Sequence, residues 1–188
     1  MPISYKLPLV FDAERLNADL NKILPSEWTA HFNKDYYEGE WKGLALRSTT
    51  GRVNQLYRPP SDTRENTDTA ILLRCAYFQE VLAAFHCPIW TVRLLGLSPG
   101  SRIKEHEDYF LGIEYRLIRI HIPIATDPRV DFFVGGKKQV MLEGEAWYID
   151  FSLPHSVDNN SDKDRIHLVL DCTVNDWLES LIPFGSQD

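Results

Sequence analysis

The amino-acid sequence predicts a mainly β fold with flanking helices, and two observations carry that prediction. Residues 90–172 form a series of short runs rich in β-branched and aromatic side chains, separated by turn dipeptides such as Gly135-Gly136. Clear helical spacing of apolar residues occurs in the first 89 residues. About seven short strands at this spacing indicate a jelly-roll barrel with helices packed against the outside of the sheet. An aligned two-layer sandwich of the immunoglobulin type is the alternative.

Two helices are expected near the N-terminus. Apolar residues from Phe11 to Leu24 recur at helical spacing, and Pro25 ends that segment. Thr67, Asp68 and Thr69 offer capping side chains for the second helix, which is expected to continue to Phe85 and to end before Pro88. Its apolar residues fall on one face, so we expect that face to pack against the sheet.

The predicted strands and loops fit one domain over residues 1–188. Residues 1–89 would be a helical and loop-rich region that supports the core and contacts substrate, and residues 90–175 would form the jelly-roll core. A strand is expected near residues 41–47, followed by a polar loop over 49–68 that contains Pro59 and Pro60. Loops longer than about 12–15 residues are more often functional than simple connectors. The strands predicted in the core are 90–97, 103–108, 115–124, 130–134, 137–142, 146–151 and 165–172.

Two of the predicted strands have one wholly aliphatic face. Because side chains alternate along a strand, four isoleucines of YRLIRIHIPI share one face, as do the isoleucine and two leucines of DRIHLVLD. Either the aliphatic face is the core and the polar face meets solvent, or the polar face lines a pocket and the aliphatic face packs against helices. The second face carries Tyr115, Leu117, Arg119 and His121 on the first strand and Arg165, His167, Val169 and Asp171 on the second.

Composition narrows the class of protein. The net charge is −7, from 20 Lys and Arg against 27 Asp and Glu, which disfavours a nucleic-acid partner. No apolar run approaches the roughly 18 residues of a membrane span, and the N-terminus lacks the plan of a secretory signal. The scattered cysteines, Cys75, Cys87 and Cys172, suggest buried thiols in a reducing compartment. We therefore expect a cytoplasmic protein with no membrane partner.

One set of residues points to chemistry. His106 and Asp108 lie two apart, a spacing that places both side chains on one face of an extended chain. His155 follows a predicted strand and a proline, at the start of a turn. Two imidazoles and one carboxylate form the facial triad of non-haem Fe(II) oxygenases. Arg165 follows His155 by ten residues on the next predicted strand, where its guanidinium could pair with a carboxylate in the same pocket.

The segment from residue 99 to 171 resembles the aspartyl/asparaginyl β-hydroxylase family of 2-oxoglutarate/Fe(II)-dependent oxygenases. The matching pieces, in order, are a Pro-Gly turn, HED at 106–108, RIHIP at 119–123, GEAWYIDF at 144–151, HSV-x-N at 155–159 and RIHLVLD at 165–171. The likeness extends more loosely upstream, through W-x-x-H-F-N and Y-x-G-x-W. This resemblance implies a double-stranded β-helix, the cupin-like jelly roll.

The resemblance also implies roles for individual residues. His106, Asp108 and His155 would be the iron ligands, and Arg165 would bind the distal carboxylate of 2-oxoglutarate. Leu95 stands where some family members have a serine that assists this arginine. The implied reaction is hydroxylation of a C–H bond in an amino acid, free, carrier-bound or within a peptide, with O2 consumed and succinate and CO2 released. Arg119 and His121 would help to fix either the cosubstrate or a substrate carboxylate, two roles that the sequence does not separate.

Two other functions are open at this stage. A metal-dependent cupin could use the triad without 2-oxoglutarate, but it would have no need of Arg165. A jelly-roll module that only binds a ligand would leave His106 and His155 far apart. Among the remaining histidines, His31 and His86 are expected to be structural, and His167 either lines the pocket or has a packing role. The arginines that could meet a substrate carboxylate are Arg47, Arg52, Arg58 and Arg93.

Overall fold

The fold consists of two antiparallel sheets with helices on the outer face of the larger sheet. It was obtained as a computed structural model that describes residues 1–58, 62 and 64–185, so Pro59 and Pro60 of the expected loop lie outside the described residues. The helices are α1 (Ala13–Leu20), α2 (Ala70–Arg74), α3 (Ala76–Ala83) and α4 (Asp176–Leu181). The strands are β1 (Ser4–Val10), β2 (Thr29–Ala30), β3 (Tyr37–Glu38), β4 (Trp41–Ser48), β5 (Thr67–Asp68), β6 (Ile89–Leu97), β7 (Arg102–His106), β8 (Leu117–Ala125), β9 (Val130–Val134), β10 (Lys137–Gln139), β11 (Glu145–Ile149), β12 (His155–Asn159) and β13 (Arg165–Thr173).

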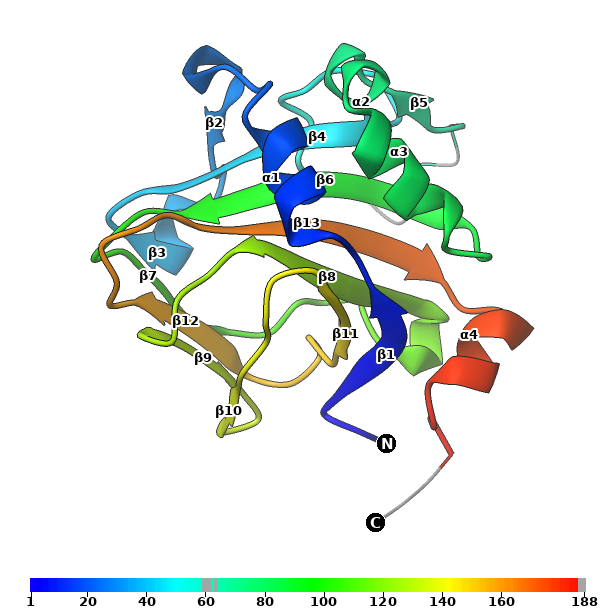
Figure 1. Cartoon of the computed structure of the whole chain (residues 1–188). Coiled ribbons are helices and arrows are strands. Elements are labelled where there is room, and N and C mark those ends of the chain that lie inside the picture. The colour runs from blue at the N-terminus through cyan, green and yellow to red at the C-terminus, as the bar shows by residue number, and fades with distance from the viewer. Residues whose placement is uncertain (59–61, 63, 186–188) are drawn as a thin grey trace.

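Strand order confirms the predicted jelly roll. The larger sheet runs β1-β11-β8-β13-β6-β4-β2 with β5 beside β4, and the smaller runs β10-β9-β12-β7-β3. Of the eight strands from β6 to β13, the first therefore pairs with the last and the second pairs with the last but one. This pairing winds the chain between the two sheets as a double-stranded β-helix, which Figure 1 shows below the layer of helices α1, α2 and α3.

On the larger sheet the aliphatic face packs against helices and the polar face lines a pocket. This is the second of the two arrangements that the sequence left open. The isoleucines of β8 and the leucines of β13 are buried in a cluster with helix residues such as Leu16, Leu72 and Phe78. The opposite face, with Arg119 and His121, lines a cavity between the sheets. Tyr115 was expected on that face, but it lies in a short 3-10 turn before β8 and is exposed.

Several predicted boundaries of helices and strands were wrong. The second helix is broken at Cys75, whose ψ of 81° is not helical, because the Asp19 carboxylate instead accepts the backbone N–H of Phe78 at 2.9 Å. The first helix is capped by Asp12 and ends at Leu20, four residues before the expected end. Strand β1 was not predicted because it contains Pro8, which an edge strand tolerates. The predicted strands 103–108, 115–124 and 137–142 are shorter in the structure, and His155–Asn159, expected as a turn, is strand β12.

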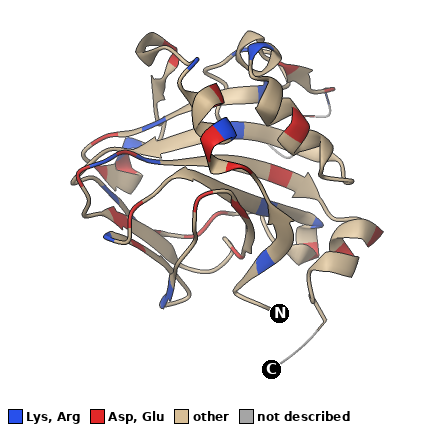
Figure 2. Cartoon of the chain, in the orientation of Figure 1, with Lys and Arg blue, Asp and Glu red and all other residues tan. Residues whose placement is uncertain are grey.

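The distribution of charge and the lengths of the helices bear on partners. In the view of Figure 2, acidic and basic positions are interspersed along the ribbon. Among the residues that the structure describes, no helix has both the length and the apolar character needed to cross a membrane.

Candidate active site

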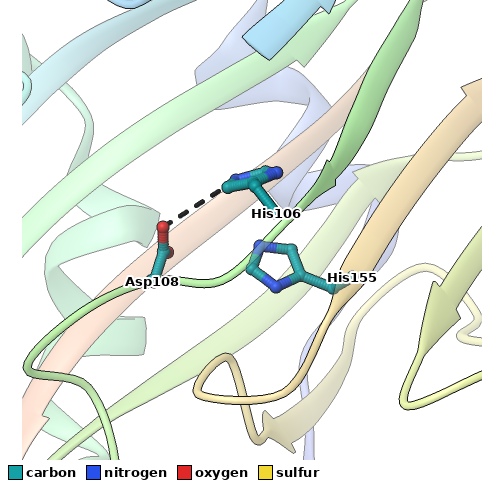
Figure 3. A group of neighbouring side chains, drawn as sticks. All are labelled: His106, Asp108 and His155. Atoms are coloured by element: carbon teal, nitrogen blue, oxygen red, sulfur yellow. Dashed lines mark ion pairs between the residues drawn. The ribbon is translucent and has the colours of Figure 1, made fainter.

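Three side chains predicted to bind a metal converge at one end of the smaller sheet. His106 ends β7, Asp108 lies two residues further on, and His155 begins β12, directly opposite His106 in the β7–β12 pair. One donor atom from each of the three lies within 4.8 Å of the others, and Nε2 of His106 is 3.8 Å from a carboxylate oxygen of Asp108. Figure 3 shows the three side chains turned toward a common point. The hypothesis of a ligand-binding module with distant histidines is therefore wrong about this geometry.

Backbone contacts set the tautomer that each imidazole adopts when it is neutral. Nδ1 of His106 donates to the carbonyl oxygen of Lys104 at 2.7 Å, and Nδ1 of His155 donates to that of Leu153 at 3.0 Å. In that tautomer the lone pair of each ring is on Nε2. Burial lowers the pKa of His155 to about 4, so this ring is neutral at pH 7.

The carboxylate of the set is held in its ionised form. Burial by itself would raise the pKa of Asp108, but Arg119, with smaller contributions from His155 and His106, outweighs burial and lowers it. Arg119 also donates through Nη1 to one Asp108 oxygen, and the other oxygen accepts no hydrogen bond from the described residues. Two imidazole nitrogens and one carboxylate are the donor set that suits Fe(II), so these residues fit a divalent iron ion.

A cavity of about 330 Å³ lies between the sheets and includes the triad in its wall. Its floor is formed by the polar face of β6, β8 and β13, and its mouth is lined by aromatic side chains that are also exposed at the surface. The polar floor residues are Arg93, Arg119, His121, Arg165 and Asp171, and the exposed aromatic residues at the mouth are Phe32, Tyr57, Tyr109 and Phe110.

Arg165 is a buried cation with no anionic partner among the described residues. Only 4% of its surface is exposed, its Nη2 donates to Nδ1 of His167 at 3.2 Å, and its Nε–H has no partner in that part of the chain. Burial lowers its pKa to about 9, so it stays charged at pH 7. Because an unpaired buried charge costs several kcal/mol, a guanidinium in this position indicates a site for an anionic ligand.

His167 is a polar side chain in contact with Arg165. Leu95 lies opposite His167 in the pairing of β6 with β13 and offers no hydroxyl group, so His167 is the polar side chain that holds Arg165. A guanidinium only donates, so Nδ1 of His167 accepts, and Nδ1 of His121 donates to it at 3.1 Å. Nε2 of His121 then carries a lone pair and has no hydrogen-bond partner among the described residues. A carboxylate at this atom would require the opposite tautomer.

Arg119 is engaged between two carboxylates. Besides Asp108, it binds Asp171 through Nε at 2.6 Å and Nη2 at 3.2 Å. Its predicted contact with the cosubstrate or substrate stays a prediction. Asp171 itself is a residue whose importance the sequence did not reveal, although it lies on the same strand face as Arg165 and His167.

Of the four arginines predicted as candidates for a substrate carboxylate, two line the cavity and two do not. Arg47 pairs with Asp68, and neither Arg47 nor Arg52 lines the cavity. Arg58 lines the cavity, but it stacks on Trp90 at 3.8 Å, and its donors go to the carbonyl oxygens of Asp62, Arg64 and Trp90 and to the Asn66 side chain. Arg93 lines the cavity and keeps one buried donor, Nε, without a hydrogen-bond partner among the described residues.

Two histidines expected to be structural have different surroundings. His31 stacks on Trp41, with ring centroids 3.5 Å apart, and lines the cavity, while burial lowers its pKa to about 4. His86 is exposed and lies against Trp177, away from the cavity.

Comparison with known proteins gives the same family as the resemblance seen in the sequence. The sequence profile of the family described as aspartyl/asparaginyl beta-hydroxylase matches residues 11–174. An L-proline cis-4-hydroxylase of Rhizobium meliloti (strain 1021) is 27% identical over 174 residues; the match covers 92% of this chain, which spans 61% of the length of that relative.

Two solved structures share the fold. An oxidoreductase of the 2OG-Fe(II) oxygenase family from Burkholderia pseudomallei matches with a TM-score of 0.58 and 13% identity, over 91% of this chain and 85% of that one. A Pseudomonas putida prolyl-4-hydroxylase matches with a TM-score of 0.54 and 10% identity, over 92% and 93% of the two chains. With its jelly roll, its converging triad and a profile match over most of its length, this chain belongs to the aspartyl/asparaginyl β-hydroxylase family of 2-oxoglutarate/Fe(II)-dependent oxygenases.

Proposed function

We propose that this protein is a 2-oxoglutarate- and Fe(II)-dependent hydroxylase of a free amino acid, with L-proline as the first substrate to test. The observation that carries the proposal is that the wall of one cavity contains both the triad and Arg165, a buried cation with no anionic partner among the described residues. A cupin that did not use 2-oxoglutarate would have no ligand for that buried guanidinium.

His106, Asp108 and His155 would hold the iron. Fe(II) bound there would supply the activation of O2 that couples decarboxylation of 2-oxoglutarate to C–H hydroxylation. Arg165 would bind the distal carboxylate of 2-oxoglutarate and so orient the cosubstrate in the cavity. The apolar side chains of Leu95, Phe132, Phe151 and Val157 line the same space and would limit the access of water.

Two arginines with unused donors support the assignment of the substrate. Arg165 and Arg93 each keep a buried Nε–H without a hydrogen-bond partner among the described residues, and both line the cavity. One carboxylate of 2-oxoglutarate would occupy the first, so we assign the second to the carboxylate of an amino-acid substrate. Arg58 is excluded from this role because its donors are already used within its own loop.

The size of the cavity favours a small substrate. Ligand pockets commonly measure about 300–1,000 Å³, and the roughly 330 Å³ available here must hold both the cosubstrate and the substrate. This favours a free amino acid over a carrier-bound residue or a peptide side chain. Proline is chosen because the curated relative at 27% identity is an L-proline cis-4-hydroxylase.

The test is a substrate screen under air with Fe(II), ascorbate and 2-oxoglutarate. Succinate is measured by NMR and hydroxylated product by mass spectrometry, for the free L-amino acids and for peptides that contain the same residues. We expect succinate to form in step with hydroxyproline. Stimulation by a peptide but by no free amino acid would overturn the substrate assignment. Failure to consume 2-oxoglutarate with any substrate would favour the cupin alternative.

Two predictions from the sequence, the division of the domain and the cellular location, remain predictions. The division of one domain into a supporting region, 1–89, and a jelly-roll core, 90–175, is a proposal about folding units. The cytoplasmic location rests on the cysteines, and the structure records Cys75, Cys87 and Cys172 as free thiols.

A further inference from the structure

We propose that Asp171 is a positioning residue that couples the metal site to the substrate carboxylate through a chain of buried ion pairs. The chain runs from Asp108 through Arg119 and Asp171 to Arg93. The inference rests on the proposed function, because it takes Asp108 as a metal ligand and Arg93 as the group that binds the substrate carboxylate.

Asp171 is the central link because it binds both guanidinium groups. Its Oδ1 accepts from Nε of Arg119 at 2.6 Å, and its Oδ2 accepts from Nη2 of Arg119 at 3.2 Å and from Nη2 of Arg93 at 2.6 Å. The hydroxyl of Thr91 also donates to Oδ2, at 2.9 Å. Neighbouring strands place these residues: in register, Asp171 of β13 lies opposite Thr91 of β6 on one side and Arg119 of β8 on the other.

The outer links reach the two ligand sites. Arg119 donates through Nη1 to Asp108, whose other oxygen faces His106. Arg93 is held by Asp171 and by the carbonyl oxygen of Leu56 at 2.9 Å, which leaves its Nε–H without a hydrogen-bond partner among the described residues. With both ligands bound, the charges would alternate from the metal ion to the substrate carboxylate.

Burial strengthens the interactions within this series of ion pairs. The side chains of Arg93, Arg119 and Asp171 are 9%, 13% and 8% exposed, so solvent screens their interactions weakly. Burial by itself would raise the pKa of Asp171, but Arg119 and Arg93 outweigh it and lower that pKa to about 2. Asp171 is therefore an anion throughout the physiological range.

The series of ion pairs predicts the sign of the coupling between metal binding and substrate binding. A divalent ion at Asp108 competes with Arg119 for that carboxylate. The ion pair between Arg119 and Asp171 therefore becomes stronger. Asp171 then holds Arg93 less strongly, and the guanidinium of Arg93 is freer to bind an incoming carboxylate. Metal and substrate should each tighten the binding of the other by the same factor, because linkage is reciprocal. We expect about tenfold, within the usual range for coupled sites.

Calorimetric titration of purified protein tests this coupling with Co(II) as the metal probe. 2-Oxoglutarate is present throughout, so that proline does not chelate the metal. The Kd of L-proline is measured with and without Co(II), and the Kd of Co(II) is measured for each variant. We expect proline to bind wild-type protein about tenfold more tightly when Co(II) is present. In Asp171→Asn we expect a change below about twofold, with Co(II) itself bound about tenfold more weakly.

The matched control is Asp150→Asn, which makes the same change at another buried aspartate. The Asp150 carboxylate accepts only from the backbone N–H and hydroxyl of Ser152 among the described residues, and it does not line the cavity. Its coupling should stay at the wild-type value. If Asp171→Asn does not fold, Thr91→Val removes one hydrogen bond from Asp171 without changing a charge, and the coupling should fall to between about twofold and fivefold.

The outcomes separate this inference from the proposed function. Wild-type coupling in Asp171→Asn, or in a folded Thr91→Val when Asp171→Asn does not fold, would overturn the inference and leave the proposed function intact. A wild-type protein that bound Co(II) and 2-oxoglutarate but not proline would remove proline as the substrate. The Co(II) titration would then decide, and an unchanged Co(II) Kd in Asp171→Asn would overturn the inference. Failure of wild-type protein to bind Co(II) would remove both proposals.

Discussion

The two faces of strands β8 and β13 are both largely buried but differ in chemistry. On the helix side, Ile120, Leu168 and Leu170 are fully buried among apolar side chains. On the cavity side, His121 and Arg165 are also only 4% exposed, yet they are polar or charged. Burial of the first face stabilises the fold through the hydrophobic effect, whereas burial of the second face costs free energy unless partners compensate it.

Unsatisfied polar atoms show where the compensation is incomplete. Of the four buried side-chain polar atoms that lack a hydrogen-bond partner among the described residues, three lie on the cavity side: Nε of Arg93, Nε2 of His121 and Nε of Arg165. The fourth, the hydroxyl of Tyr148, lies in the helix-side core. The helix-side face therefore maintains the fold, and the cavity-side face is arranged for ligands. Substitutions on the two faces should therefore affect different measurements.

The largest effect is expected at the triad. His155→Ala removes one of three metal ligands, so succinate formation should fall by at least about a thousandfold. The melting temperature of the metal-free protein should change little, because this face contributes little to stability. Turnover is followed by NMR and unfolding by circular dichroism, with the exposed His86→Ala as the control. Turnover near the wild-type rate in folded His155→Ala would remove His155 as a ligand.

On the helix side the effects should be reversed. Leu168→Ala leaves a cavity in the aliphatic cluster and should lower the free energy of unfolding by about 2–5 kcal/mol. The KM for 2-oxoglutarate of the folded fraction should stay within about twofold of wild type, because the substituted atoms face away from the cavity. Urea unfolding and steady-state kinetics measure the two quantities. A large rise in KM with no loss of stability would contradict the separation of the faces.

The next effect is expected at Arg165. Arg165→Ala should raise the 2-oxoglutarate concentration needed for half-maximal turnover by about a hundredfold, because a lost buried charge-assisted contact is worth about 2–4 kcal/mol. Stability should not fall, since the substitution removes a buried cation that has no anionic partner in the part of the chain that the structure describes. Arg116→Ala, at an exposed arginine paired with Glu179, is the control. An unchanged requirement for 2-oxoglutarate would show that Arg165 has another role.

The smallest effect is a dependence of stability on pH. Burial lowers the pKa of both His121 and His167 well below the ordinary value of 6.5, with Arg165 as a further cause for each. As the pH falls below about 6.5, the unfolded chain takes up protons at these histidines before the folded protein does. The metal-free protein should lose up to about 1.4 kcal/mol per pH unit for each such histidine.

The pH dependence of a histidine variant shows whether that histidine contributes to the loss of stability. Urea midpoints measured between pH 7.5 and 5 should fall toward acid, and the fall should be shallower in His167→Asn than in wild type. Equal slopes in the two proteins would indicate that His167 is not neutral in the folded state.

The sequence was sufficient to predict the parts of the fold that follow from local periodicity. Alternation along β8 and β13 predicted which side chains share a face, and the motif from His106 to Arg165 predicted the residues around the cavity. The number and spacing of the short strands allowed either a sandwich or a jelly-roll barrel, and the family resemblance favoured the jelly roll. Strand β12 escaped prediction because HSVDN is a polar sequence with weak strand propensity, although its residues alternate between the two burial levels.

The sequence was not sufficient where the outcome depends on register between distant strands. The ion pairs of Asp171 exist because β13 lies between β6 and β8, which places Arg93 and Arg119 on either side of it. The break at Cys75 likewise depends on Asp19, a residue 56 positions earlier in the chain. Among the candidate arginines, only contacts in three dimensions show which donors are already used.

Anaerobic absorption spectroscopy shows whether one cavity holds both a ferrous ion and 2-oxoglutarate. Addition of Fe(II) and then 2-oxoglutarate to the metal-free protein should produce the weak visible charge-transfer band of a chelated complex. The band should be absent from Asp108→Ala and His155→Ala, and in Arg165→Ala it should require far more 2-oxoglutarate. A well-folded wild-type protein that gives no band at saturating concentrations would contradict the account.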